Sequence, residues 1–169
     1  MGFDTHVRRG HPIVFGLIVF FGIIELAISA WLVSHFNKHH NYSGTSERDR
    51  VRFLLFSSIW TVVFGALYMV LFWHSASGSV ATSVLSHGIF LFLTWIFWTA
   101  GAAAITSSLG GGLNCSTQNI FVYCGQLNAL EGFAWAIWIM VTFAILIVFI
   151  RGVSAARRGD GLRGHLVSA

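Results

Sequence analysis

The segment FLLFSSIWTVVFGALYMVLFW, residues 53–73, decides the fold. It contains no Asp, Glu, Lys or Arg, and the charge-free stretch continues to Leu130. A helix of about 20 apolar residues is long enough to cross the roughly 30 Å hydrocarbon core of a bilayer. The segment is therefore predicted to be a membrane-spanning helix.

The composition of the whole chain supports a membrane protein. Of its 169 residues 56% are hydrophobic and 9% are charged, whereas about 25% of a soluble domain is charged. The net charge is +4, but the basic residues lie at the ends of apolar segments and form no basic face. This distribution argues against nucleic acid as a partner.

Four apolar segments are long enough to span a bilayer, at about residues 12–36, 53–73, 82–108 and 127–150. Pro12 suits the first turn of the first helix. The connections are rich in Gly, Ser and Asn, and no repeat is visible. The expected fold is a single all-α domain, an integral membrane four-helix bundle with a short N-terminal segment and a flexible basic C-terminal tail.

The first apolar segment has an alternative interpretation as a cleaved signal peptide. Arg8 and Arg9 precede it, and Ala27-Ile28-Ser29-Ala30 resembles a cleavage site. Against cleavage, the apolar segment is too long and is interrupted by Glu25. A retained first helix is preferred.

Charge and sequons predict that both termini are cytoplasmic. Four spans place both termini on one side, and basic residues favour the cytoplasmic side. The terminal side carries more of them (Arg8, Arg9, Arg151, Arg157, Arg158, Arg163) than the opposite side (Lys38, Arg48, Arg50, Arg52). Asn41-Tyr42-Ser43 and Asn114-Cys115-Ser116 match the glycosylation pattern, and the arrangement places both Asn41 and Asn114 on the non-cytoplasmic side.

Cys115 and Cys124, the only cysteines, lie in the connection before the fourth span. On the non-cytoplasmic side disulfides form and persist. The chain has no CxxC and this loop has no histidine, which disfavours a redox pair or a zinc site. We expect a disulfide that stabilises the loop by about 2–3 kcal/mol and holds residues 120–123 as an apolar cap over the helix ends.

Glu25 lies near the middle of the first span, where a carboxyl is costly and often functional. With Gly22 and Ser29 it forms a stripe at helical spacing that should face the bundle interior. A proton or ion relay is one interpretation. The preferred one is a neutral carboxyl hydrogen-bonded to Thr61, Thr94 or an indole N–H, because no other ionisable groups align with it.

The remaining polar residues have structural interpretations. Arg52 and Glu131 are at matching depth and are expected to form an interfacial ion pair. His87, near the inner end of the third span, is expected to be hydrogen-bonded rather than a metal ligand. His39 and His40 beside His35 could bind a metal adventitiously, but their spacing alone is unspecific. Four arginines of the tail are expected to contact anionic lipids, with no fixed structure beyond about Ala156: Arg151, Arg157, Arg158 and Arg163.

No catalytic, metal or cofactor-binding pattern appears in the sequence. It has no HExxH and no phosphate-binding glycine loop, and Gly110-Gly111-Gly112 is interpreted as a helix end and turn. The chain is therefore not expected to be an enzyme or to bind a cofactor. Five of the seven tryptophans fall deep within the spans and are expected to pack against protein or lipid, with a sterol or acyl-chain groove as the alternative: Trp60, Trp95, Trp98, Trp135 and Trp138.

Four segments have an order and content that go beyond general hydrophobicity: ELAISAWLV, RFLLFSSIWTVVFGALYMVL, FLFLTWIFWTAGAAAITSSLGGGLNC and YCGQLNALEGFAWAIWIMVTF. Together they resemble the MARVEL family of tetraspan membrane proteins, in its small single-domain fungal branch, and the resemblance covers roughly residues 12–152. It implies four helices with cytoplasmic termini. It also implies a role in membrane apposition, vesicle trafficking or organisation of membrane subdomains, without catalytic residues.

The leading functional expectation is a non-enzymatic organiser of membrane subdomains or vesicles. It would act through lipid contacts, with sterol or anionic lipids as candidates, through self-association, or through membrane-protein partners. The plasma membrane or vesicles of the secretory and endocytic system are the expected location. The alternatives are a small transporter or channel that uses Glu25, an accessory subunit of a larger membrane complex, and, lacking any assembled site, a membrane-embedded enzyme.

Overall fold

The computed structural model describes residues 2–74 and 84–157, which form four long helices: α1 (Gly2–His39), α2 (Thr45–His74), α3 (Val84–Leu109) and α4 (Cys124–Arg157). Each contains a segment long and apolar enough to cross a membrane: Ile13–His39, Thr45–Leu71, Ser86–Leu109 and Cys124–Ile150. The predicted all-α fold with four spans is confirmed.

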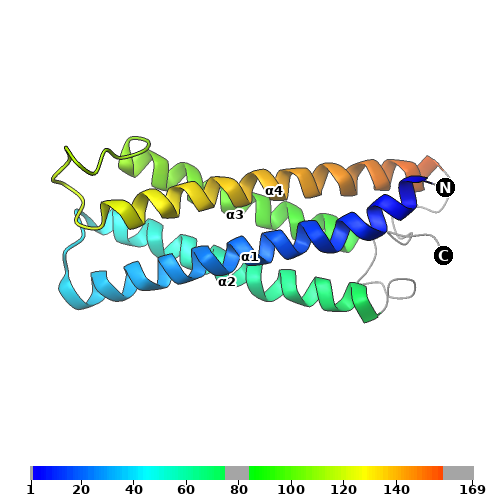
Figure 1. Cartoon of the computed structure of the whole chain (residues 1–169), viewed down its shortest axis with the longest axis horizontal. Coiled ribbons are helices and arrows are strands. Elements are labelled where there is room, and N and C mark those ends of the chain that lie inside the picture. The colour runs from blue at the N-terminus through cyan, green and yellow to red at the C-terminus, as the bar shows by residue number, and fades with distance from the viewer. Residues whose placement is uncertain (1, 75–83, 158–169) are drawn as a thin grey trace.

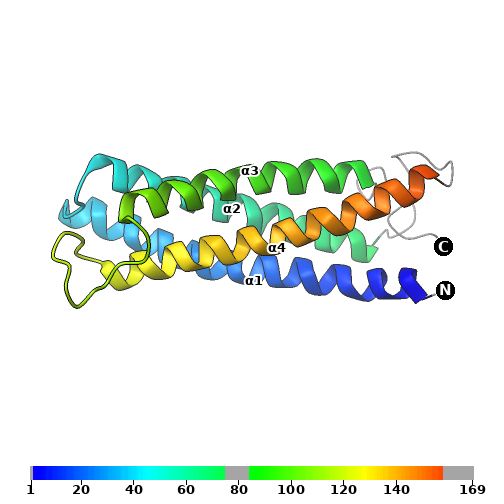
Figure 2. The ribbon, with the colours of Figure 1, turned by 90° about the horizontal axis from the view of Figure 1, so that it is seen from above.

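The helices run alternately up and down along one axis (Figure 1). α1 packs against α2 and α4, and α3 packs against the same two helices, so α2 and α4 lie on a diagonal (Figure 2). The start of α1 and the end of α4 lie at one end of the bundle, which we call the terminal end. The connections 40–44 and 110–123 lie at the other, which we call the loop end.

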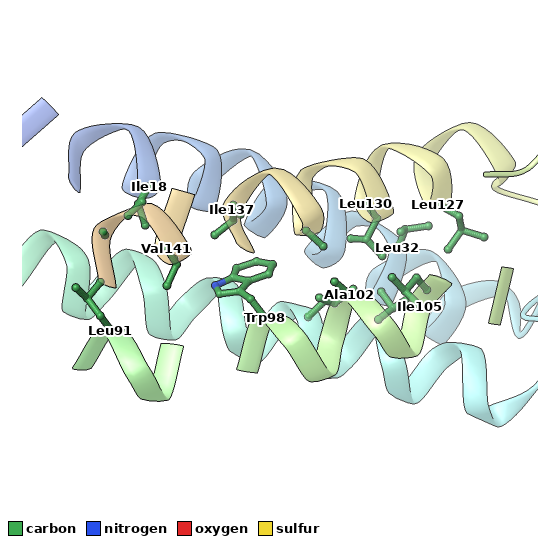
Figure 3. Packing of buried hydrophobic residues seen from close by; sticks show 14 of the residues in the cluster. Ile18, Leu32, Leu91, Trp98, Ala102, Ile105, Leu127, Leu130, Ile137 and Val141 are labelled. Atoms are coloured by element: carbon green, nitrogen blue, oxygen red, sulfur yellow. The ribbon is translucent and has the colours of Figure 1, made fainter. Parts of the chain in front are cut away.

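The bundle interior is filled by large side chains. Trp98 is 0% exposed and lies near the middle of the core, with Ile137 and Val141 of α4 facing it (Figure 3). The outward surface is also apolar, with large side chains exposed along all four helices, among them Ile13, Phe20, Val63, Phe92 and Phe143. A helix that is apolar on every side is stable in hydrocarbon, as a bilayer-spanning bundle requires.

Local chemistry explains the helix boundaries at the loop end. α2 begins at Thr45, earlier than predicted, because the Glu47 carboxylate accepts hydrogen bonds from the backbone N–H and the hydroxyl of Ser43, both at 2.7 Å. α3 ends where Gly110 and Gly111 adopt positive φ and donate their N–H groups to the carbonyl of Thr106. The interpretation of these glycines as a helix end is confirmed.

Glycines allow the helices to approach closely. A Cβ at Gly101 of α3 would lie 2.6 Å from a methyl carbon of the buried Leu54 of α2. A Cβ at Gly65 of α2 would lie 2.9 Å from a methyl carbon of Val19 of α1. Small residues at membrane helix interfaces let dispersion contacts form between backbones, so these positions fix how α2 sits between its neighbours.

Candidate functional site: polar groups inside the bundle

Tryptophan and threonine side chains join α2 to α3 in a reciprocal pair. The Trp60 indole of α2 donates to the Thr94 hydroxyl of α3 at 3.1 Å. The Trp98 indole of α3 donates to the Thr61 hydroxyl of α2 at 2.9 Å. Because each helix supplies one donor and one acceptor, the two bonds fix the axial register between α2 and α3.

The same arrangement joins α3 to α4. The Trp95 indole donates to the Thr142 hydroxyl at 3.0 Å, and the Trp138 indole donates to the Thr99 hydroxyl at 2.8 Å. The sequence alone predicts only packing contacts for these tryptophans. The available signal was spacing, because Trp95/Thr99 and Trp138/Thr142 both stand four apart, on one face of a helix.

Each of these threonine hydroxyls accepts one hydrogen bond and donates another. Thr61, Thr94 and Thr142 accept from an indole and donate to the carbonyl four residues earlier in their own helix. Thr99 does the same toward the Trp95 carbonyl. Buried polar groups in a membrane must find partners inside the protein. Each threonine hydroxyl therefore uses its one donor and one of its acceptor positions within the bundle, and these groups serve as interhelical contacts.

The expected ion pair between Arg52 and Glu131 is wrong. Glu131 of α4 accepts a 2.7 Å hydrogen bond from Thr106 of α3, whose hydroxyl in turn accepts from the Trp135 indole at 2.9 Å. Arg52 of α2 donates to Asn37 of α1 at 2.9 Å. Equal depth did not bring the two charges together because α2 and α4 lie on a diagonal of the bundle.

Glu25 is 0% exposed and faces the bundle interior with Ser29 and Gly22, as predicted. The expected hydrogen bond from its carboxyl is wrong, since neither carboxyl oxygen has a hydrogen-bond partner among the residues that the structure describes. The groups predicted to bind the carboxyl have other hydrogen-bond partners. Thr61 and Thr94 bind the carbonyls of their own helices, and the indoles of Trp60 and Trp98 bind those threonines.

His87 of α3 is fully buried near the terminal end. Its ring lies edge-on to Tyr68 at 4.7 Å and to Phe15 at 5.9 Å between ring centroids. Within residues 2–74 and 84–157, no group of three or more His, Cys, Asp or Glu side chains could hold a metal ion. The aromatic surroundings make His87 part of the core packing at this end.

Cys115 and Cys124 form the predicted disulfide, with their Cα atoms 5.7 Å apart. The expected apolar cap is only partly formed. Phe121 and Tyr123 pack against the core, whereas Ile120 and Val122 are 71% and 64% exposed. The Gln118 side chain fixes this segment, because its oxygen accepts from the N–H groups of Ile120 and Phe121 and its nitrogen donates to the carbonyl of Phe121.

The two predicted sequons lie in different environments. The Asn41 side-chain nitrogen, where a glycan would attach, donates to the Tyr123 hydroxyl at 2.9 Å, and the Ser43 hydroxyl is bound to Glu47. Asn114 and Ser116 are both exposed, and the Ser116 hydroxyl donates to the Asn114 side-chain oxygen at 2.6 Å. The asparagine of the second sequon is exposed, whereas Asn41 is half-buried and its side-chain nitrogen is engaged.

The predicted lipid-binding arginines fall outside the described side chains. α4 extends to Arg157, but the side chains of Arg151 and Arg157 are not described, and Arg158 and Arg163 lie beyond the described residues. Their contact with anionic lipids remains a prediction.

No protein-family model, curated protein or solved structure matches the chain. The fold and the interior polar contacts define its class: a multi-pass helical bundle with four candidate membrane spans. The resemblance to the MARVEL family remains a prediction from the sequence.

Proposed function

We propose that the protein is a non-enzymatic organiser of membrane subdomains, membrane apposition or vesicles. It acts through lipid contacts, self-association or binding of other membrane proteins. The observation that carries the proposal is the contrast between an interior packed with the protein's own side chains and large apolar side chains exposed along all four helices. Because the interior is occupied by the protein's own side chains, lipids and protein partners have to bind to its outer surface. The plasma membrane or vesicles of the secretory and endocytic system are the proposed location.

The interior polar contacts support an organiser over a carrier. Transport needs polar groups that can exchange partners with a solute along a path. Here the threonines and indoles bind one another across α2, α3 and α4. Trp98, Leu91 and Ile137 are buried in the apolar core of the same bundle (Figure 3). The same contacts hold the helices in one register, which favours a rigid body that presents a constant surface.

A small transporter or channel is the second candidate, and Glu25 favours it. An ionisable group buried in a membrane with no hydrogen-bond partner is a functional site by default. The unbonded carboxyl is stronger support for this candidate than its sequence position alone. An accessory role in a larger membrane complex remains compatible with the organiser proposal, since it would use the same outer surface.

We propose that the terminal end faces the cytoplasm, because of the arginine distribution, the disulfide and the exposed sequon. We expect a glycan on Asn114 in the expressing eukaryotic cell and none on Asn41, whose amide is engaged by Tyr123. Endoglycosidase should shift the electrophoretic mobility of wild type and of Asn41→Gln, but not of Asn114→Gln. A glycan on neither asparagine, combined with protease-accessible C-terminal residues on the outside of sealed cells, would contradict this orientation.

Reconstitution tests the organiser proposal. Copies labelled with donor and acceptor dyes on the N-terminus are mixed in giant vesicles at falling protein-to-lipid ratios. We expect energy transfer above the random-mixing value, or enrichment of the protein in one lipid phase, over the whole series. Random-mixing transfer together with equal partition between lipid phases would contradict both self-association and lipid selectivity. Recovery of defined membrane-protein partners in mild detergent is the corresponding test of partner binding.

A further inference from the structure

Two histidines occupy one face of α1 at the loop end. His35 is half-buried, and His39, four residues later, is exposed in the last turn of the helix. Residues four apart are neighbours on a helix surface. The two ring centroids are 5.9 Å apart and the ring planes differ by 33°. Histidines at this spacing are the pair that binds one zinc ion on the helix of HExxH metalloproteases.

A hydrogen bond of His35 indicates which of its two ring nitrogens can bind a metal ion. Its Nδ1 lies 2.9 Å from the backbone carbonyl oxygen of Trp31. A carbonyl only accepts, so Nδ1 must carry the proton, and in the neutral ring Nε2 then holds a free lone pair. Metal-binding histidines are usually oriented in this way, with the second nitrogen donating to a carbonyl or carboxylate.

The surrounding rings hold His35 in place. It stacks on Trp31 with the ring centroids 3.7 Å apart, and the Tyr123 ring meets it edge-on at 5.7 Å. Tyr123 is itself held by the amide of Asn41 and by the neighbouring disulfide at Cys124. A ligand whose ring is already fixed loses little conformational entropy when it binds a metal.

The distance between the rings suits a shared ion. A metal lies about 2.0–2.1 Å from each imidazole nitrogen, so two imidazoles on one ion have their centroids about 5–6 Å apart. His39 is exposed in the last turn of α1, so its side chain has room to rotate toward a shared ion. Lys38 and Arg52 are the nearby cations, and Asp49, paired with Arg52, is the nearby carboxylate. Neutral imidazoles therefore have to supply the affinity, with water completing the coordination shell.

We propose that His35 and His39 form a two-histidine site for a divalent transition-metal ion at the loop end of the bundle. Imidazole suits Zn²⁺, Cu²⁺ and Ni²⁺, and affinity rises toward Cu²⁺ in the ordinary order of divalent metals. The site lies outside the filled interior, so it is independent of the organiser and transporter proposals. It lies next to the loop closed by the disulfide, because the His35 ring contacts Tyr123.

The test uses the full chain in detergent at neutral pH, titrated with Cu²⁺ and separately with Zn²⁺. We expect one site that binds Cu²⁺ more tightly. His39→Ala should weaken Cu²⁺ binding at least tenfold. Loss of a residue that only supports a metal ligand already costs about 10–100-fold in affinity, and His39 is proposed to be a ligand itself. His39 is exposed, so this variant should unfold at the wild-type temperature without metal. The electron paramagnetic resonance spectrum of the Cu²⁺ complex should show two imidazole nitrogens in wild type and one in His39→Ala.

Two matched variants separate a built site from adventitious binding. His40→Ala removes an adjacent exposed histidine and should leave the affinity unchanged. The double variant Asn37→His with His39→Asn keeps the composition but moves the histidine off the shared face, and should bind as weakly as His39→Ala. An equal loss of affinity in His40→Ala, or wild-type affinity in the double variant, would show an adventitious ion only and overturn the proposal.

Discussion

Replacement of Trp98 by Ala is expected to lower the free energy of unfolding by about 3–5 kcal/mol, the usual cost of removing a large aromatic side chain from a packed core. Trp98 is 0% exposed, lies at the centre of the bundle and donates to Thr61 of the neighbouring helix. SDS titration in detergent micelles, followed by the helical circular dichroism signal, measures the change.

Two variants divide this effect into packing and hydrogen bonding. Trp98→Phe keeps most of the ring and loses the indole N–H, and should recover most of the stability. An interhelical hydrogen bond in a membrane protein contributes about 0.6 kcal/mol on average, so the bond is the smaller part. The matched control is Trp31→Ala at a site 38% exposed, which should cost much less. Equal losses at Trp31 and Trp98 would contradict the central position of Trp98.

Replacement of Glu25 by Met is expected to raise the free energy of unfolding by about 1–3 kcal/mol, the cost of a buried polar group without a partner. Methionine has a similar shape and brings no polar atom that needs a hydrogen bond. Glu25→Gln should change stability little, because the amide enters the same surroundings as the unbonded carboxyl. The same SDS titration compares the three proteins.

A loss of stability in Glu25→Met would show that the carboxyl has a partner after all, such as a bound water or ion. A gain of stability in Glu25→Met would also bear on function. A residue that destabilises the fold and yet is present is a candidate for function, because stability alone does not require it. If Glu25→Met stabilises the protein, proton or ion transport that depends on Glu25 has to be measured directly.

The parts of the structure that depend on local sequence could be predicted. The four spans follow from the absence of charge, the end of α3 from Gly110 and Gly111, and the inward direction of Glu25 from its spacing with Ser29. The disulfide followed from two cysteines in one short loop. Each of these inferences uses residues close together in the chain.

The parts that depend on how helices face one another could not be predicted. Depth placed Arg52 and Glu131 at one level, but depth carries no information about which helices are diagonal. The partners that the sequence predicts for the Glu25 carboxyl instead bind each other, in the Trp60–Thr94 and Trp98–Thr61 hydrogen bonds. Those pairs require the axial register between two helices, and one sequence without contacts does not fix it.

Proton and ion flux through reconstituted vesicles tests the organiser proposal most directly. The comparison is wild type against Glu25→Gln, both assembled in sealed vesicles with an imposed pH or ion gradient and a fluorescent reporter inside. Glutamine cannot release a proton, so a carrier that depends on this carboxyl must fail in the variant. We predict no flux above protein-free vesicles for either protein, with equal folding and self-association. A robust wild-type flux that Glu25→Gln abolishes would contradict the organiser proposal and assign the protein to transport.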